Sequence, residues 1–349
     1  MPRPTPMHEQ ASIVVFRFSA MGDVAMAAAV VRDFCAQYPQ ITVIFVSRPT
    51  YQSFFSGIRG VTFHPIHPGT DHRGGRGLYR LFRELAAYRP LAVADLHHNI
   101  RSRILAAFFR LGGIPVQHID KGRKEKKALT RRKQRILRPL KPTVERYADV
   151  FRALGYPEFT LPAKLQKQSR PLPELARRLF ADPQSAKIGI APFAQHAAKT
   201  YPPERMETVI AYLTKQGHDV FIFGGGATEQ QAAAAWEIRH PGVTSLIGRF
   251  PLQQELDIIA HLDLMLTMDS AGMHLASLMG VRVLSVWGGT HPYTGFLGYG
   301  QRMEDCIQVD HPNRPSSVYG NKPCICDGKD SMELIEPQLI ISRLNALGL

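Results

Sequence analysis

The chain is poor in the features that mark several large classes of protein. It has four cysteines in 349 residues, too few for a disulfide scaffold in a chain of this length. No apolar run approaches the ~18 residues of a membrane-spanning helix. The first residues, MPRPTPMHEQ, lack the basic and then apolar layout of a signal peptide. We therefore expect a soluble, cytoplasmic protein that is stabilised by an ordinary hydrophobic core.

Signatures of metal and common cofactor sites are also scarce. Cys324-Ile-Cys326, with Cys306 and His311 upstream, has thiols and an imidazole that suit zinc, but no second C-x-x-C pair accompanies them. Loop thiols are the simpler interpretation, and we predict no metal. The glycine-containing loops match neither G-x-G-x-x-G nor a Walker A lysine loop, which argues against a nicotinamide enzyme or an ATPase.

Acidic residues are outnumbered, with 29 Asp and Glu against 43 Lys and Arg, for a net charge of +14. Nearly all of this excess lies in residues 121–141, which hold eleven Lys or Arg and one Glu. The segment is either a solvated face or mobile loop, or a site for an anionic partner. It contains no aromatic residue on which the bases of single-stranded nucleic acid stack. A phosphorylated lipid or an anionic membrane surface is therefore the favoured partner.

Strand-like and helix-like segments, in contrast, alternate along the whole chain. One series has strand-like runs in 11–16, 41–49, 61–66 and 91–98, and a second series begins near Lys187. A segment rich in proline and polar residues, 158–176, separates them as a linker. Since single cores stop growing near ~250–300 residues, two domains are expected. The pattern predicts an α/β protein with two doubly wound domains whose strand ends face a central cleft.

The first candidate functional residue is Asp23. An apolar β-branched run ends before Ser-Ala-Met-Gly-Asp at 19–23, and an Ala-rich helical pattern follows. This order places Asp23 at the carboxyl end of the first strand, where open α/β sheets bind ligands. Asp23 is equally suited to capping the helix that follows, so both interpretations stand.

The second half of the chain concentrates residues suited to phosphate binding. A strand ends at Asp269, and a helix begins within Ser270-Ala271-Gly272, so free backbone N–H groups and the positive end of the helix dipole form an anion site. Lys199 lies in a polar loop after another strand and adds a point charge, unless it is an ordinary surface lysine. His274, one turn into the helix, fits a structural histidine better than a reactive one.

Four motifs in this order resemble the lipopolysaccharide heptosyltransferases of glycosyltransferase family 9. They are SAMGD at 19–23, DLHHNIRS at 95–102, KTYP at 199–202 and DSAGMH at 269–274. The resemblance extends over essentially the full length. The chain departs from the family where Tyr201 replaces a frequent Trp, Ser270 replaces Thr, and His97-His98 replaces Gln-Gly.

The resemblance implies an inverting, metal-independent glycosyltransferase of the GT-B fold, with two Rossmann-like domains and no cofactor beyond its donor substrate, ADP-heptose. It implies Asp23 as the general base that deprotonates the acceptor hydroxyl. The donor would be bound by Lys199, Glu229, Asp269, Ser270, Ala271, Gly272 and His274. Glu229 is otherwise an ordinary glutamate of a first helical turn. No Asp-x-Asp triplet occurs, which fits a mechanism in which protein cations stabilise the departing diphosphate.

The expected acceptor is the inner core of lipopolysaccharide, linked to lipid A and reached by peripheral contact with the cytoplasmic face of the inner membrane. Acceptor binding is assigned to Asn99, Arg101, Lys124, Lys126, Lys127, Arg131 and Arg132. The domains are expected at 1–165 for the acceptor and 175–331 for the nucleotide sugar, with a helix at 332–349 crossing back to the first. Two alternatives are a GT-B glycosyltransferase or epimerase using another nucleotide sugar, and a non-catalytic protein that binds nucleic acid through its basic segment.

Overall fold

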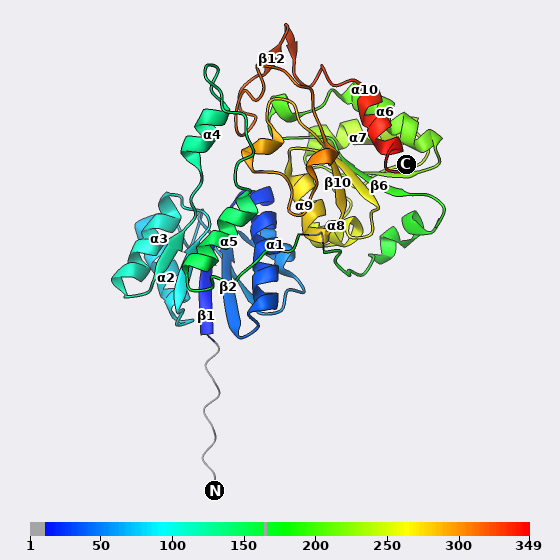
Figure 1. Ribbon diagram of the computed structural model, residues 1–349. Coiled ribbons are helices and arrows are strands. Elements are labelled where there is room, and N and C mark those ends of the chain that lie inside the picture. The colour runs from blue at the N-terminus through cyan, green and yellow to red at the C-terminus, as the bar shows by residue number, and fades with distance from the viewer. Residues whose placement is uncertain (1–10, 164–165) are drawn as a thin grey trace. The chain divides into compact units, whose positions relative to one another are not determined.

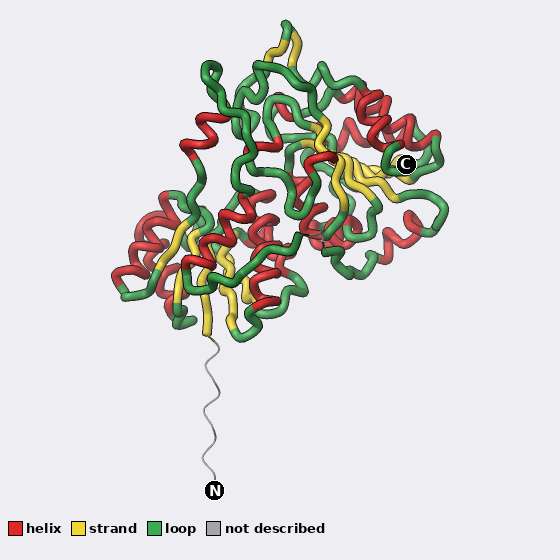
Figure 2. The backbone as a smooth tube through the Cα atoms, in the orientation of Figure 1, coloured by secondary structure: helices red, strands yellow, loops and turns green. Residues whose placement is uncertain are grey.

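A computed structural model describes residues 11–163 and 166–349 (Figure 1). The first ten residues and the domain boundary expected at residue 165 lie outside the described residues. The chain divides into two compact units, each built around a parallel sheet. The first unit runs to Lys121 and resumes over Val144–Leu161, and the second comprises Gly122–Thr143 and Pro162–Leu349. Figure 2 shows the strands of each unit gathered together with helices around them.

The first unit has a five-stranded sheet in the order β3-β2-β1-β4-β5, and all its strand pairs are parallel. Parallel neighbours require crossover connections, which helices supply. The elements in chain order are β1 (Ala11–Phe16), α1 (Met21–Gln37), β2 (Ile41–Ser47), η1 (Pro49–Phe55), β3 (Val61–Pro65), α2 (Gly74–Ala86), β4 (Ala92–Asp95), α3 (Ile100–Leu111), β5 (Val116–His118) and α5 (Thr143–Ala153).

Strand order in this sheet reverses between β1 and β4. The chain proceeds outward from β1 through β2 to β3, and then returns to β4 on the other side of β1. The last residues of the two strands, Phe16 and Asp95, are partners in the register. The loops that follow β1 and β4 therefore leave the sheet side by side, at the point where doubly wound sheets bind ligands.

The second unit has a six-stranded parallel sheet in the order β11-β10-β9-β6-β7-β8, which reverses between β6 and β9. Its main elements are η2 (Glu174–Phe180), β6 (Lys187–Ala191), η3 (Ala197–Lys199), α6 (Pro203–Lys215), β7 (Asp219–Ile222), α7 (Ala227–Arg239), β8 (Val243–Ser245), α8 (Leu252–Ile259), β9 (Leu264–Met268), α9 (Ala271–Met279) and β10 (Arg282–Val286). After them come η4 (Pro292–Thr294), η5 (Met303–Asp305), β11 (Cys306–Ile307), the hairpin β12 (Ile325–Cys326) and β13 (Lys329–Asp330), and α10 (Pro337–Asn345). Both units thus have the Rossmann-like arrangement predicted from the sequence.

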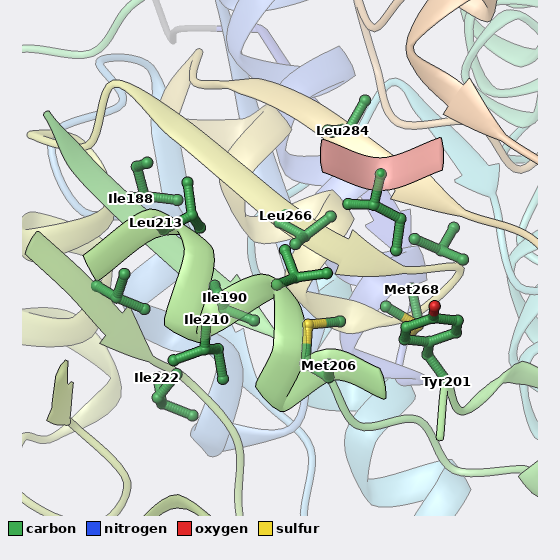
Figure 3. Close-up of a cluster of buried hydrophobic side chains, with 14 of the residues drawn as sticks. Ile188, Ile190, Tyr201, Met206, Ile210, Leu213, Ile222, Leu266, Met268 and Leu284 are labelled. Carbon is green, nitrogen blue, oxygen red and sulfur yellow. The ribbon is translucent and has the colours of Figure 1, made fainter. Parts of the chain in front are cut away.

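The core of the second unit forms where α6 covers the sheet (Figure 3). Ile190 of β6 and Leu266 of β9 are fully buried together with Met206 and Ile210 of α6. Each such side chain contributes about 1.5–3 kcal/mol through burial. Tyr201 lies in the same cluster and donates its hydroxyl hydrogen bond to a backbone carbonyl 2.8 Å away, so its one polar atom is satisfied. This packing fixes the loop before α6, which carries Lys199.

Two segments lie elsewhere than the sequence led us to expect. The stretch 122–143, which includes α4 (Arg123–Leu129) and most of the basic segment, belongs to the second unit instead of the first. The terminal helix α10 packs on α6 of the second unit, where Tyr212 contacts Asn345, instead of returning to the first unit. Among the described residues, no helix is both long and apolar enough to cross a membrane.

Candidate active site

Asp23 lies in the first turn of α1, directly after the loop that follows β1. Its carboxylate accepts a hydrogen bond from the backbone N–H of Ala20 at 3.4 Å and forms an ion pair with Arg17. The side chain is 25% exposed, so one part of the carboxylate is held while another part meets solvent. Asp23 therefore does occupy a helix-start position, and it also presents an accessible carboxylate at the switch point of the sheet.

Arg17 is the buried partner that orients this carboxylate. It leaves the end of β1, donates to the carbonyl of Leu96 at 3.0 Å, and lies 5.9 Å from the ring centroid of Tyr147. Burial by itself would lower the pKa of the guanidinium, yet the negative charge of Asp23 in contact with it raises the pKa above its ordinary value. Burial also raises the pKa of Tyr147, which stays protonated. The cluster therefore holds a permanent cation against Asp23.

His97 borders the same cluster from the loop after β4. Its Nδ1 accepts a hydrogen bond from the backbone N–H of Phe18 at 3.1 Å. Burial, with the nearby charges of Arg17 and Lys121, lowers the pKa of His97 to about 3. The imidazole is therefore neutral near pH 7 and adds a polar, uncharged side chain next to the carboxylate.

Asn99 and Arg101, both assigned to the acceptor from the sequence, occupy the start of α3. The Asn99 side chain caps the helix by accepting from the backbone N–H of Ser102 at 2.9 Å. The Ser102 hydroxyl donates in turn to the buried Asp95 at 2.9 Å, so this motif builds the loop after β4. Arg101 is exposed beside it. The position of Asn99 is explained by capping, while Arg101 is available to an anionic ligand.

In the second unit, Lys199 and Asp269 meet at the switch point of the sheet. Lys199 follows β6 and Asp269 follows β9, and the Lys199 Nζ lies 3.1 Å from a carboxylate oxygen of Asp269. The lysine side chain is 15% exposed and the aspartate side chain 6% exposed. A Cβ at Gly320 would come within 2.2 Å of the lysine stem, so the backbone of a distant loop packs closely on it. These contacts hold the ammonium in place before any ligand binds.

The start of α9 supplies backbone donors next to this pair. Ser270 is the N-cap residue, but its side chain makes no capping hydrogen bond and instead approaches Thr267 at 3.3 Å. Ala271 and Gly272 form the first turn, whose N–H groups have no partner within the helix. A Cβ at Gly272 would lie 2.5 Å from the Cβ of Ala191, so only glycine lets α9 approach β6 this closely. The arrangement suits a bound phosphate.

Glu229 and His274 complete the set of residues predicted to bind a nucleotide sugar. Glu229 lies in the first turn of α7, and its carboxylate accepts from the backbone N–H of Gly225 at 2.7 Å. It thereby closes the glycine turn after β7. His274 is buried within α9, four positions into the helix. Both follow strands of the same sheet as Lys199 and Asp269.

The basic segment is anchored by specific contacts within the second unit. Lys126 is buried, with its ammonium 4.1 Å from the ring centroid of Phe296. Arg135 donates to the backbone carbonyl of Pro312 at 2.6 Å and also contacts the carbonyl of Arg314. The four other predicted acceptor-binding cations of the segment are exposed, namely Lys124, Lys127, Arg131 and Arg132. The segment is therefore anchored on the second unit while these four predicted cations remain accessible to solvent.

The cysteines are free thiols in this structure. Burial raises the pKa of Cys306 to about 11, and burial together with the neighbouring Cys324 raises that of Cys326 to about 11. Within the described ranges, no cluster of three or more His, Cys, Asp or Glu residues has the geometry to hold a metal ion. Neutral, buried thiols are poor nucleophiles and poor metal ligands.

Sequence reasoning missed Arg17, Tyr147 and His97 as neighbours of Asp23. For Arg17 a signal was present, because a charged residue interrupts an otherwise apolar strand run immediately before the Gly-Asp motif. His97 belongs to the DLHHNIRS motif, where the sequence shows it only as a departure from the family and gives no sign of its contact with this cluster. Tyr147 belongs to α5, more than a hundred residues away in sequence, and no local pattern identifies it.

Known proteins share this architecture over their full length. A glycosyltransferase family 9 protein from Veillonella parvula superposes with a TM-score of 0.75 and 17% identity, covering 99% of each chain. The Escherichia coli ADP-heptose lipopolysaccharide heptosyltransferase II gives a TM-score of 0.68 and 21% identity, covering 97% of this chain and 98% of that one. The E. coli heptosyltransferase WaaC with ADP superposes with a TM-score of 0.67 and 17% identity, covering 96% of this chain and 99% of that one.

Among curated proteins, the lipopolysaccharide core heptosyltransferase OpsX of Haemophilus influenzae is 25% identical over 364 residues, covering 97% of each chain. Two Rossmann-like units with this connectivity define a glycosyltransferase of the GT-B fold. The sequence profile of glycosyltransferase family 9 (heptosyltransferase) matches residues 78–322, which is well over half of the chain. The chain belongs to glycosyltransferase family 9.

Proposed function

We propose that the protein transfers a heptose from ADP-heptose, with inversion, to the inner core of a lipid A-linked lipopolysaccharide acceptor. In this reaction the acceptor oxygen bonds to the anomeric carbon as the bond to the diphosphate breaks. The acceptor proton passes to Asp23, and ADP departs as an anion that needs no proton. One base therefore suffices, in contrast to inverting hydrolysis, which needs an acid and a base.

The observation that carries this proposal is the environment of Asp23. A partly exposed carboxylate at the carboxyl end of β1 is held by a buried arginine and faces a neutral histidine. Arg17 holds the carboxylate in one orientation, which a base needs in order to meet the acceptor hydroxyl. A residue serving only as a helix cap has no need of a buried guanidinium in contact with its side chain.

Support for the donor site comes from the paired charges at β6 and β9. Lys199 lies next to Asp269, so it can exchange that partner for a diphosphate without moving far. The N–H groups at Ser270, Ala271 and Gly272 add donors aimed at the same anion, while Glu229 is assigned to the ribose hydroxyls and His274 to contact with the donor. Because lysine and helix N–H groups stabilise the leaving diphosphate, we propose a mechanism without a metal ion or other cofactor. The names of two similar structures, E. coli ADP-heptose lipopolysaccharide heptosyltransferase II and heptosyltransferase WaaC with ADP, mention an adenine nucleotide and support an ADP-linked donor.

We assign the acceptor phosphates to the exposed cations Lys124, Lys127, Arg131 and Arg132 of the basic segment, and to Arg101 of the first unit. Lys126 would act indirectly, by fixing the segment on Phe296. Asn99 would shape the loop that carries Arg101. The lipopolysaccharide named for the Haemophilus relative is a phosphorylated amphiphile of this kind. The protein would act at the cytoplasmic face of the inner membrane through peripheral contact.

The proposal is tested by supplying ADP-heptose and a panel of other nucleotide sugars to the protein with core lipid extracts, and measuring products by mass spectrometry. The expected product is one heptose heavier than the acceptor and forms only with ADP-heptose. Thermal stabilisation by ADP, but not by UDP or GDP, is expected in parallel. Transfer or epimerisation of a different nucleotide sugar would replace the proposed function with that activity. Strong retention on heparin without any response to ADP would favour a nucleic-acid binder.

A further inference from the structure

Helix α3 of the first unit has two apolar faces, although a helix on the surface of a soluble domain needs only one. Leu105 and Phe109 are buried in the core of the unit. On another side, Ile100 is 77% exposed, Ile104 is 37% exposed and Leu111 is 86% exposed. Spacings of four and seven residues place these three on one stripe of the helix. Part of α3 therefore presents apolar side chains to solvent.

This stripe borders a groove of about 500 Å³ between α3 and β5. Strand β5 is at the edge of the sheet, and α3 lies beside α2 at the same end of the unit (Figure 1). Ile100 and Ile104 line the groove together with Arg103 and Arg110 of α3 and His118 of β5. The groove thus combines apolar and basic side chains on an exposed edge.

The positive charge of the groove is not neutralised by the protein. Arg103 and Arg110 are exposed and, among the described residues, form no ion pair; Arg110 reaches only the backbone carbonyl of Val116 at 3.5 Å. The carboxylate in the lining, Asp95, is buried and accepts hydrogen bonds from the Ser102 hydroxyl and from two backbone N–H groups. Two free guanidinium groups beside an apolar stripe suit an anionic amphiphile.

We propose that the face formed by α3 and β5 docks on an anionic lipid bilayer, with Ile100 and Leu111 entering the interface and Arg103 and Arg110 contacting lipid phosphates. Residues 122–141 of the basic segment belong to the other unit, whereas Lys121 belongs to this one and donates to the carbonyl of His98 at 3.3 Å. The inference rests on the proposed function in one respect, since a lipid-linked acceptor is presented at a bilayer. A partner surface made of protein would need no phosphates, and it is the alternative that the test addresses.

The test is co-sedimentation with vesicles of phosphatidylcholine alone or mixed in equal parts with phosphatidylglycerol. Wild-type protein is expected to bind the mixed vesicles and to be released by salt. Replacing Arg103 and Arg110 by Gln lowers the partition coefficient about five-fold for each charge. The pair Ile100→Ser and Leu111→Ser lowers it at least about ten-fold, because exposed apolar area no longer leaves water.

A matched control is the pair Leu175→Ser and Ile238→Ser in the second unit, where the side chains are 79% and 85% exposed. These substitutions remove the same apolar area from elsewhere and leave vesicle binding unchanged. Vesicle binding of the Ile100 and Leu111 pair equal to wild type, or an equal loss in the control, would overturn the proposal. If the true partner of this face is a protein, the variant with Ile100→Ser and Leu111→Ser would likewise bind vesicles as wild type does.

The proposed docking face and the proposed function are contradicted by different results. Heptose transfer to a deacylated, water-soluble acceptor does not need the bilayer, so the α3 variants keep the wild-type rate with it. With the acceptor embedded in vesicles, their rate falls in step with vesicle binding. Absence of transfer by wild-type protein to both acceptors would contradict the proposed function and leave the vesicle result to decide the docking face.

Discussion

Asp23 and Lys199 are each held in place by an oppositely charged neighbour. Arg17 holds Asp23 from the buried side, so the carboxylate keeps one orientation while part of it stays exposed. Lys199 is held in the same way by Asp269, whose side chain is 6% exposed and has little access to water. In both pairs, removing one partner would leave the other charge in an unfavourable environment. A substitution of Lys199 therefore needs a second substitution, at Asp269, to separate ADP binding from stability.

Lys199→Ala should weaken ADP binding by ~1.5–3 kcal/mol, the range for hydrogen bonds to charged groups. Because the substitution also strands the buried Asp269, it is expected to lower the melting temperature. Adding Asp269→Asn should restore the melting temperature without restoring ADP affinity. Calorimetric titration of the double variant measures this, and wild-type affinity there would remove Lys199 from the donor site.

His97 makes the folding stability of the protein depend on pH in the acidic range, which can be measured. Its folded-state pKa is about 3, whereas an exposed histidine titrates near 6.5. The unfolded chain therefore binds a proton that the folded chain refuses, and stability falls as the pH drops from about 6.5 towards 3. Between about pH 7 and about pH 5 the loss from this residue is about 1–2 kcal/mol.

His97→Asn should reduce that loss, since asparagine accepts the hydrogen bond of Phe18 without titrating. Thermal denaturation of both proteins at the two pH values measures the difference. His291, whose pKa is lowered to about 4 by burial and by Arg314, contributes the same trend in both proteins and cancels from the comparison. An equal loss in wild type and variant would show that His97 does not resist protonation.

At the scale of elements, the sequence predicts the alternation of strands and helices well, because buried parallel strands read as continuous runs of β-branched residues. The strand expected at 61–66 is β3 at Val61–Pro65, and the helix expected after Asp269 is α9. It is harder to predict which elements pack on one another. Arg135 bonds to carbonyls 177 and 179 residues away, and carbonyls leave no signature in a sequence. Likewise, the amphipathic pattern of α10 shows that it packs, but not on which helix.

Close approach of α9 to β6 sets the position of the predicted phosphate site, and Gly272 permits it. Gly272→Ala would place a Cβ within 2.5 Å of Ala191 and 3.0 Å of Thr267, so α9 must shift. We expect a loss of about 1–3 kcal/mol in stability and weaker ADP binding. Gly75→Ala is the control, because a Cβ there meets no atom within 4 Å. Denaturation and ADP titration of both variants test the role of α9; unchanged ADP affinity in Gly272→Ala would argue against it.

At the scale of the whole molecule, the residues predicted to bind ligands lie at the reversal of the sheet in each unit, and the basic segment adds cations to the second unit. The topology rule predicts both sites from the strand order alone. The assignment of residues 121–141 to the first unit followed chain order, whereas the structure anchors the segment on loops near Phe296 and Pro312. Contacts between segments that are distant in sequence determine to which unit the basic segment belongs, and a single sequence does not show such contacts.

Replacing four exposed cations of this segment by Gln should raise the KM for a phosphorylated acceptor. The replaced residues are Lys124, Lys127, Arg131 and Arg132. Lys126 is kept, because it is buried against Phe296. About five-fold per charge is expected at low salt, with a flatter dependence on ionic strength. With a dephosphorylated acceptor, wild type and variant should have the same KM. A difference that persists there would mean that the segment does not recognise phosphate.

Asp23 is proposed to be the base for heptose transfer from ADP-heptose. The most direct measurement compares wild type with Asp23→Asn in one assay, following the heptose-extended acceptor by mass spectrometry and ADP affinity by calorimetry. We expect product with wild type, a kcat lower by ~10²–10⁴ in the variant, and nearly unchanged ADP affinity. A variant that retains activity within a few-fold of wild type would contradict the account and reduce Asp23 to a helix-start residue.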